Sequence, residues 1–183
     1  IETMWGFVGF TGMRAEREAI LHRMADRIIH RGPDMEGYHL SGDTPENAVA
    51  LGFRRLSIID LAAGKQPMYN EDGSMVIVFN GEIYNYQALR EELIAAGHTF
   101  ASHSDTEVLL HGYEQWGKQL PGKLRGMFTF AIWDKNTRTL FGARDIFGIK
   151  PFYYYHKNGH FMFGSEIKSF LSHPNFEKEL DED

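Results

Sequence analysis

Three polar residues in succession, Asn80, Gly81 and Glu82, follow directly on an apolar run at residues 75–79. A side-chain amide, an unhindered backbone N–H at a glycine and a carboxylate together offer the donors and acceptors that hold a small polar ligand. An Asn-Gly pair is also typical of a plain hairpin turn, because both residues tolerate positive φ. The elements on either side of the pair must decide between these interpretations.

The run at 75–79 is rich in β-branched residues, which predicts a strand buried on both faces and ending at Asn80. Apolar residues then recur at helical spacing until Gly97, which is typical of a helix end. The pair therefore joins a strand to a helix, and the polar residues lie at the strand end. A simple connection with Asn85 as the helix cap remains the alternative.

Charged residues occur in two other places that matter for a binding site. Arg54 and Arg55 interrupt the β-rich run at 48–59. A buried charge is costly unless it is paired, so we expect one arginine to bind an anion and the other to face solvent. Asp105 lies in the sequence Ser-Asp-Thr-Glu at 104–107, which is typical of a capping box at the start of a helix. A carboxylate in the first turn of a helix is favoured by the helix dipole, so the presence of Asp105 there needs no functional explanation.

Composition limits the function classes. The 183 residues suffice for one core, and a net charge of -6 argues against nucleic acid as a partner. Neither a membrane span nor a signal pattern is recognisable, so we expect a cytoplasmic protein without a membrane partner. The lack of cysteine excludes disulfides, thiolate metal sites and thiol nucleophiles. The nine histidines show no convincing ligand spacing, so no metal is predicted.

The segments with strand composition fall in two groups separated by helices, which predicts an α+β fold of two packed antiparallel sheets covered by helices. Asn158-Gly159 lies between two such segments and predicts a hairpin. We place one domain at residues 1–172 and an acidic linker or tail at 173–183. The strand segments are 4–10, 48–59, 75–79, 127–133, 139–143, 152–155 and 161–163.

Taken together, these stretches resemble the glutamine amidotransferase domain of asparagine synthetases, a class II domain of the N-terminal-nucleophile hydrolases. The resemblance implies a four-layer αββα sandwich that hydrolyses glutamine to glutamate and ammonia. The matching segments run nearly end to end: 6–9, 31–34, 55–60, 66–69, 79–86, 104–107, 126–134, 143–154 and 164–168.

The resemblance also implies roles for five residues. The Asn80 side chain and the Gly81 N–H would form the oxyanion hole. Arg55 would hold the α-carboxylate of glutamine by charge-assisted hydrogen bonds. Glu82 and Asp105 would take the α-ammonium group. The two charged ends of glutamine would thus each meet protein residues of opposite charge.

The nucleophile of the family is missing from this sequence. Trp5 stands where the family has a cysteine that is the mature first residue, and residues 1–4 precede it. Indole is not a nucleophile, and a peptide nitrogen cannot act as the base that a free α-amino group supplies. Loss of the nucleophile from a covalent-catalysis enzyme typically costs roughly a millionfold in turnover.

Three interpretations follow from Trp5. The chain is an amidotransferase domain with a replaced nucleophile, or it is a pseudoenzyme domain with a structural, amino-acid-sensing or regulatory role. The third is a rerouted activity with Thr3, Thr11 or Ser57 as nucleophile, although none has a recognisable base beside it.

In the family this domain works with an ATP-consuming synthetase domain that receives the ammonia. We expect that partner domain, with its ATP and Mg²⁺, to lie outside this sequence, and we expect no cofactor for the amidotransferase domain itself. The acceptor substrate is left open, and so is a homodimer.

Overall fold

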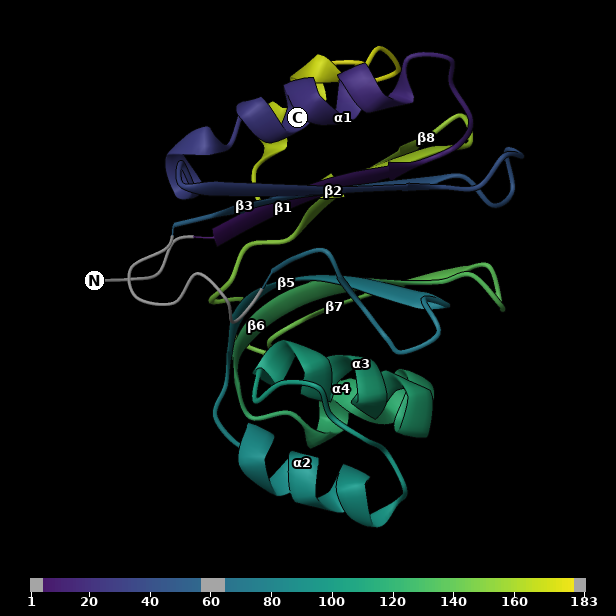
Figure 1. The fold of residues 1–183 in the computed structure, drawn as a ribbon. Coiled ribbons are helices and arrows are strands. Elements are labelled where there is room, and N and C mark those ends of the chain that lie inside the picture. The colour runs from purple at the N-terminus through teal and green to yellow at the C-terminus, as the bar shows by residue number, and fades with distance from the viewer. Residues whose placement is uncertain (1–4, 57–64, 180–183) are drawn as a thin grey trace.

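The computed structural model describes residues 5–56 and 65–179. Two antiparallel sheets lie face to face, and helices cover the outer face of each, so that four layers are stacked (Figure 1). The four-layer αββα sandwich expected from the sequence is therefore confirmed. No helix in the described ranges is long and apolar enough to cross a membrane.

The first sheet has the strand order β2-β3-β1-β9-β8. Its outer face is covered by α1 (Arg17–Asp26) and by a short 3₁₀ segment at Ile167–Ser172 (Figure 1). The hairpin predicted at Asn158-Gly159 is confirmed, since both residues have positive φ angles, 52° and 75°. A second 3₁₀ segment spans Ile29–Arg31. The strands are β1 (Trp5–Thr11), β2 (Met35–Ser41), β3 (Val49–Arg55), β8 (Tyr153–Lys157) and β9 (His160–Gly164).

The second sheet has the strand order β4-β5-β6-β7, and three helices cover its outer face (Figure 1). Its strands are β4 (Met68–Tyr69), β5 (Met75–Ile83), β6 (Gly126–Asp134) and β7 (Thr139–Arg144). The helices are α2 (Tyr86–Ala95), α3 (Asp105–Trp116) and α4 (Leu120–Lys123), with a 3₁₀ segment at Gly117–Gln119.

The predicted end of β5 at Asn80 is wrong, because the strand continues to Ile83. Asn80 pairs with Thr129 and Ile83 with Gly126, so β6 is paired along its whole length. Gly81 allows this continuation with a φ of 149°, a conformation that other residues rarely adopt. Pairing with a complete neighbouring strand thus overrides the local turn preference of Asn-Gly.

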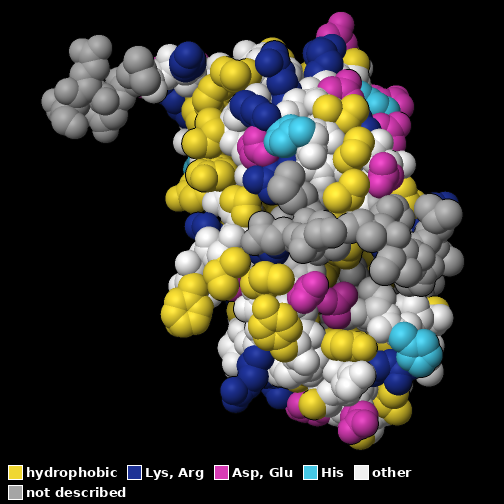
Figure 2. All heavy atoms as spheres, turned by 90° about the vertical axis from the view of Figure 1, so that its left-hand side faces the viewer, with side chains coloured by type: hydrophobic (Ala, Val, Ile, Leu, Met, Phe, Trp, Pro, Cys, Tyr) yellow, Lys and Arg dark blue, Asp and Glu magenta, His cyan; other side chains and the backbone are white. Residues whose placement is uncertain are grey.

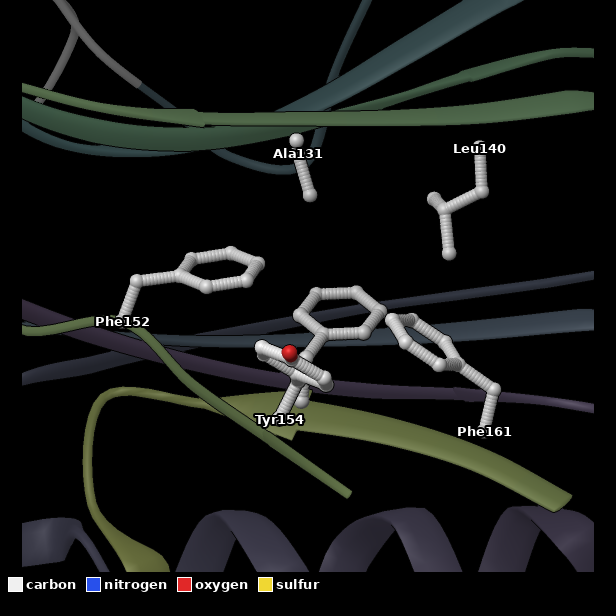
Figure 3. Close-up of a pocket in the computed structure, with 7 residues that line it drawn as sticks. Ala131, Leu140, Phe152, Tyr154 and Phe161 are labelled. Atoms are coloured by element: carbon white, nitrogen blue, oxygen red, sulfur yellow. The ribbon is translucent and has the colours of Figure 1, made fainter. Parts of the chain in front are cut away.

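The layer between the sheets is filled by aromatic and aliphatic side chains from both, among them Phe7, Phe53, Val76 and Val78. Away from the polar residues described below, a partly open cavity of about 270 Å³ lies between the sheets (Figure 3). Among the described residues no carboxylate, amine or imidazole lines it, and the Tyr154 hydroxyl is its polar side-chain group. Its lining is Ala131, Leu140, Gly142, Phe152, Tyr154, Phe161 and Phe163.

Residues 173–179 pack back on the first sheet and its helix. The His173 ring is buried with its centroid 4.8 Å from that of Phe10, and Phe176 packs against Tyr155. Lys157 forms ion pairs of 2.5 and 2.7 Å with Glu177 and Glu179. This part of the segment is therefore ordered against the sandwich, while a domain boundary at 172 stays a prediction.

His173 should make folding stability depend on pH. Burial lowers its pKa from 6.5 to about 4, and its Nδ1 accepts a hydrogen bond from the Asn175 N–H as a neutral imidazole. A lowered folded-state pKa contributes stability that is present above pH 6.5 and is lost as the pH falls toward 4. We expect this group to contribute about 2 kcal/mol to the loss of stability between pH 7.5 and 4.5.

Urea unfolding at both pH values checks this expectation. His173→Gln should reduce the pH dependence by that amount, whereas substitution of the exposed His156 by glutamine should leave it unchanged. Parallel pH dependence in the wild type and His173→Gln would contradict the assignment.

Candidate functional site

β1 begins, and β3 and β5 end, at the same end of the sandwich (Figure 1). Side chains alternate along a strand, so residues two apart share a face. On β5, Val76 and Val78 lie between the sheets, which places Asn80 and Glu82 on that same face. Figure 2 looks onto this end of the molecule, which carries both acidic and basic side chains.

Arg55 and Trp5 face each other across neighbouring strands of the first sheet. They are direct partners in the β1–β3 register, and the Arg55 Cζ lies 5.2 Å from the centre of the indole ring. The Trp5 ring also packs edge-on against Phe53, with centroids 6.1 Å apart. Its buried Nε1 donates no hydrogen bond within the described part of the chain. Trp5 thus fills the space next to Arg55 without satisfying its own polar atom.

Arg54 corrects one expectation from the sequence. It was expected that one arginine of the pair would face solvent, yet the Arg54 side chain is only 7% exposed. It lies on the opposite face of β3 from Arg55, under α1, and forms ion pairs of 2.5 Å with Asp26 and 2.7 Å with Glu36. The alternation of strand side chains, together with a helix over the outer face, buries both arginines in different layers.

The N–H of Gly81 points to the free edge of β5. Phe79 and Ile83, two residues before and after it, donate their N–H groups on this edge to Gln66 Oε1 at 2.6 Å and to Asp105 Oδ2 at 3.1 Å. Gly81 lies midway between these two residues, and the alternation of backbone groups along a strand directs its N–H to the same edge. A backbone donor therefore lies between the Gln66 amide and the Asp105 carboxylate.

The partner strand supports this orientation. Phe128 is the β6 residue opposite Gly81, and it directs both of its backbone groups to Asp145 instead, with the Asp145 N–H 2.8 Å from the Phe128 carbonyl oxygen. A Cβ on Gly81 would lie 2.1 Å from the Met127 carbonyl oxygen. Only glycine therefore fits at this position.

Asn80 is 2% exposed, and its Oδ1 accepts no hydrogen bond from the residues that the structure covers. A buried amide with unused hydrogen-bonding capacity normally costs about 1–3 kcal/mol. A buried acceptor without a donor is typical of a site that receives its hydrogen-bond partner from a ligand.

Glu82 and Asp105 bring two carboxylates together at this end. Burial raises the pKa of Asp105, the hydrogen bond from the Ile83 N–H opposes that rise, and the nearby Glu82 charge adds to it. Two neighbouring carboxylates favour a cation between them. Asp105 is also the first residue of α3, whose cap Ser104 accepts a hydrogen bond from the Thr106 N–H at 3.1 Å.

The capping box itself is only half formed. The Glu107 carboxylate does not accept a hydrogen bond from the Ser104 N–H, as a complete capping box requires. It accepts hydrogen bonds of 2.7 Å from the N–H groups of Ala101 and Ser102. The carboxylate thereby orders the connection that precedes α3. This connection positions Asp105 next to the end of β5.

The structure thus brings Trp5 into contact with Arg55, and it links Gly81 and Glu82 with Asp105 at the end of β5. Of the three alternative nucleophiles, Thr11 lies at the opposite end of β1, paired with Val49. Thr3 and Ser57 lie outside the described residues. A rerouted nucleophile therefore gains no support from the placement of Thr11.

Sequence reasoning missed the role of Gln66. Its buried side chain donates to the Phe79 carbonyl oxygen at 3.1 Å and accepts from the Phe79 N–H, so that it continues the hydrogen bonding of β4 along β5. The sequence carries no pattern that identifies a side chain, such as that of Gln66, which makes the hydrogen bonds that the backbone of a neighbouring strand would otherwise make. Gly81 follows two residues after Phe79, where the hydrogen bonds from Gln66 end.

Comparison with known proteins places these residues in a family. The model of the family described as "Glutamine amidotransferase domain" matches residues 4–183. Glutamine-hydrolysing asparagine synthetase 1 of Bacillus subtilis is 50% identical over 173 residues, which cover 92% of this chain and 27% of that protein. Glutamine-hydrolysing asparagine synthetase 3 of Arabidopsis thaliana is 40% identical over 157 residues, which cover 85% of this chain and 26% of that protein.

Solved structures show the same fold at lower identity. Glutamine phosphoribosylpyrophosphate amidotransferase from B. subtilis superposes with a TM-score of 0.73 at 20% identity, covering 91% of this chain and 43% of that one. The fold is therefore that of the N-terminal-nucleophile amidotransferases. The chain spans about a quarter of the length of the curated relatives given above.

Proposed function

Since the chain belongs to the glutamine amidotransferase domain family, we propose that it is the glutamine-hydrolysing, ammonia-supplying domain of an asparagine synthetase-like protein. The observation that carries this proposal is the convergence of Arg55, Asn80, Gly81, Glu82 and Asp105 at one end of the two sheets. In this proposal the partner is an ATP- and Mg²⁺-dependent synthetase domain, and the location is the cytoplasm.

Charge complementarity supports glutamine as the ligand. Arg55 as a whole residue is 8% exposed. Its guanidinium group suits an α-carboxylate, which it can bind through two parallel hydrogen bonds. The carboxylates of Glu82 and Asp105 suit an α-ammonium group, whose positive charge would relieve their mutual repulsion. The two ends of an amino acid thus find partners of opposite charge.

The side-chain amide of glutamine would then meet the oxyanion hole. The Asn80 side-chain N–H and the Gly81 backbone N–H are the two donors that the family assigns to this hole, and preorganised donors of this kind stabilise the negative oxygen of a tetrahedral intermediate. Attack on the amide carbon needs a nucleophile at the start of β1. Trp5 supplies none, so we infer that the chain as written retains the specificity site without turnover.

A second function is favoured by one observation. The indole of Trp5 occupies the space beside Arg55, as expected of a pseudoenzyme domain that keeps its pocket closed or reserved for sensing an amino acid. In that case the chain as written should bind an amino acid or a partner without chemistry.

Calorimetry measures the binding of glutamine, and it therefore tests the assigned binding residues independently of whether glutamine is hydrolysed. We expect no glutamate release from the chain as written, and we expect Trp5→Ala, which opens the space but adds no nucleophile, to bind glutamine. Arg55→Met in that background should weaken binding by about 10- to 100-fold, because it removes a charged hydrogen-bond partner.

Arg125→Met is the matched control, since Arg125 is exposed and lies outside the proposed site. Its affinity should equal that of Trp5→Ala alone. Binding that survives Arg55→Met would overturn the substrate assignment. Glutamate release by the unaltered chain would mean that a residue other than the one at position 5 carries out the attack.

A further inference from the structure

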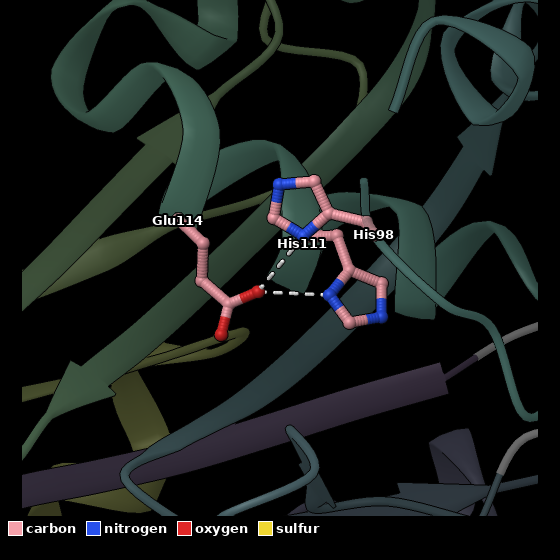
Figure 4. A group of neighbouring side chains, drawn as sticks. All are labelled: His98, His111 and Glu114. Atoms are coloured by element: carbon pink, nitrogen blue, oxygen red, sulfur yellow. Dashed lines mark hydrogen bonds and ion pairs between the residues drawn. The ribbon is translucent and has the colours of Figure 1, made fainter. Parts of the chain in front are cut away.

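A group of two imidazoles and one carboxylate lies on the helical layer of the second sheet, apart from the residues assigned to glutamine (Figure 4). His98 comes from the connection between α2 and α3, and His111 and Glu114 come from α3. The Nδ1 atoms of both histidines face the same oxygen of Glu114, at 3.5 Å for His98 and 2.8 Å for His111. All three ligand atoms lie within 4.8 Å of one another.

These separations suit a small divalent cation. Zn²⁺ binds histidine nitrogen and carboxylate oxygen at about 2.0–2.2 Å, which places the donors of a tetrahedral site roughly 3.3–3.5 Å apart. The His98–Glu114 distance already has this value, and the His111–Glu114 distance must lengthen by about 0.5 Å. The two imidazole nitrogens, which lie within 4.8 Å of each other, must settle at the same separation. Metal binding would release any proton on these nitrogens to solvent.

Neighbouring residues orient the three ligands. The His98 Nε2 lies 3.0 Å from Gln115 Oε1, a contact in which the nitrogen must donate, so that its Nδ1 lone pair is directed at Glu114. The Asn70 amide donates to the second oxygen of Glu114 at 2.7 Å. Outer-shell hydrogen bonds of this kind fix the tautomer and orientation of metal ligands. Without a cation or a proton, the His98 lone pair would face a carboxylate.

The local charge also favours a cation. His111 is 1% exposed, and its Nε2 lies 3.5 Å from a Glu107 oxygen and 3.6 Å from a Glu71 oxygen, without a hydrogen bond among the described residues. Glu114 adds a third carboxylate, whose two oxygens lie within hydrogen-bonding distance of His111 Nδ1 and the Asn70 amide. Three acids surround one imidazole.

We propose that His98, His111 and Glu114 bind Zn²⁺, with water as the fourth ligand. The chain has no cysteine, so no thiolate competes for the ion. Bound zinc would tie the connection that carries His98 to the middle of α3. The sequence signal for such a site is the i,i+3 spacing of His111 and Glu114 on one helix, and the proposal departs here from the prediction of no metal.

Titration of the chain with ZnCl₂ tests the proposal. We expect the melting temperature to rise by roughly 5–10 °C when free zinc exceeds its dissociation constant by about 100-fold. Co²⁺ should give visible absorption bands of four-coordinate geometry. His98→Gln should weaken zinc binding by at least about 100-fold, beyond the effect of losing an outer-shell partner.

His98 is chosen because it is on a connection and is partly exposed, so that its substitution leaves the core intact. His103→Gln is the matched control, an exposed histidine in the same connection, and it should bind zinc as the wild type does. A wild-type chain without a zinc-dependent shift, or equal binding by His98→Gln, would overturn the proposal.

Discussion

Removing residues 1–4 and replacing Trp5 by cysteine is expected to raise glutamate release from glutamine by on the order of a millionfold, the factor that a covalent nucleophile typically contributes. The new first residue would supply both a thiol and a free α-amino group. An amine beside the thiol can accept its proton during attack and return it to the leaving ammonia.

The structure gives three reasons for this large effect. Position 5 begins β1 directly opposite Arg55, at the end of the sandwich where β5 ends. Replacing the indole frees the space beside Arg55 and removes the unpaired Nε1 donor. The remaining β1 residues keep their pairing with β3, since the substitution is at the terminal pair.

Two matched chains isolate the cause. Trp5→Cys with residues 1–4 retained has the thiol without the free amine, and trimmed Trp5→Ala has the amine without the thiol. Both should release glutamate far more slowly than the trimmed cysteine variant. A trimmed cysteine variant with native circular dichroism but no glutamate release would refute the glutaminase assignment, whatever the outcome of the zinc titration.

Most of the architecture could be predicted because it depends on local patterns. The β-branched run in β5 and the Asn158-Gly159 hairpin follow from side-chain burial and backbone preference, which are visible in a single segment. The resemblance to a known family added the four-layer arrangement. Such features need no knowledge of which segments meet.

The errors concern features that depend on the partner segment. Asn80 and Gly81 are turn formers, and only the length of β6 explains why the strand continues through them. Arg54 and Arg55 are indistinguishable in sequence, and their opposite faces become meaningful only when α1 and the second sheet are in place. The proximity of His98 and His111 also depends on a partner segment, since it arises only where the α2–α3 connection packs on α3.

Asn80 provides the second large effect, and it is measured in the trimmed Trp5→Cys background. Asn80→Ala should lower kcat by about 10²- to 10³-fold with little change in KM, the cost of removing one oxyanion-hole donor. The reason is that Asn80 is buried near the end of β5 on the face between the sheets, next to Gly81, where its side-chain N–H would donate to the reacting oxygen.

Asn85 is the matched control because its amide is structural. It donates to the Lys123 carbonyl oxygen and accepts from the Arg125 N–H, each at 2.9 Å, and thereby ties the start of α2 to the segment before β6. Asn85→Ala should lower the free energy of unfolding by about 1–3 kcal/mol and leave kcat near its starting value. If Asn80→Ala instead raised KM with kcat unchanged, Asn80 would bind the ground state of glutamine and the oxyanion assignment would fail. A loss confined to kcat requires a contact that strengthens as the amide oxygen becomes negative, and Asn80 beside the Gly81 N–H is placed to make it.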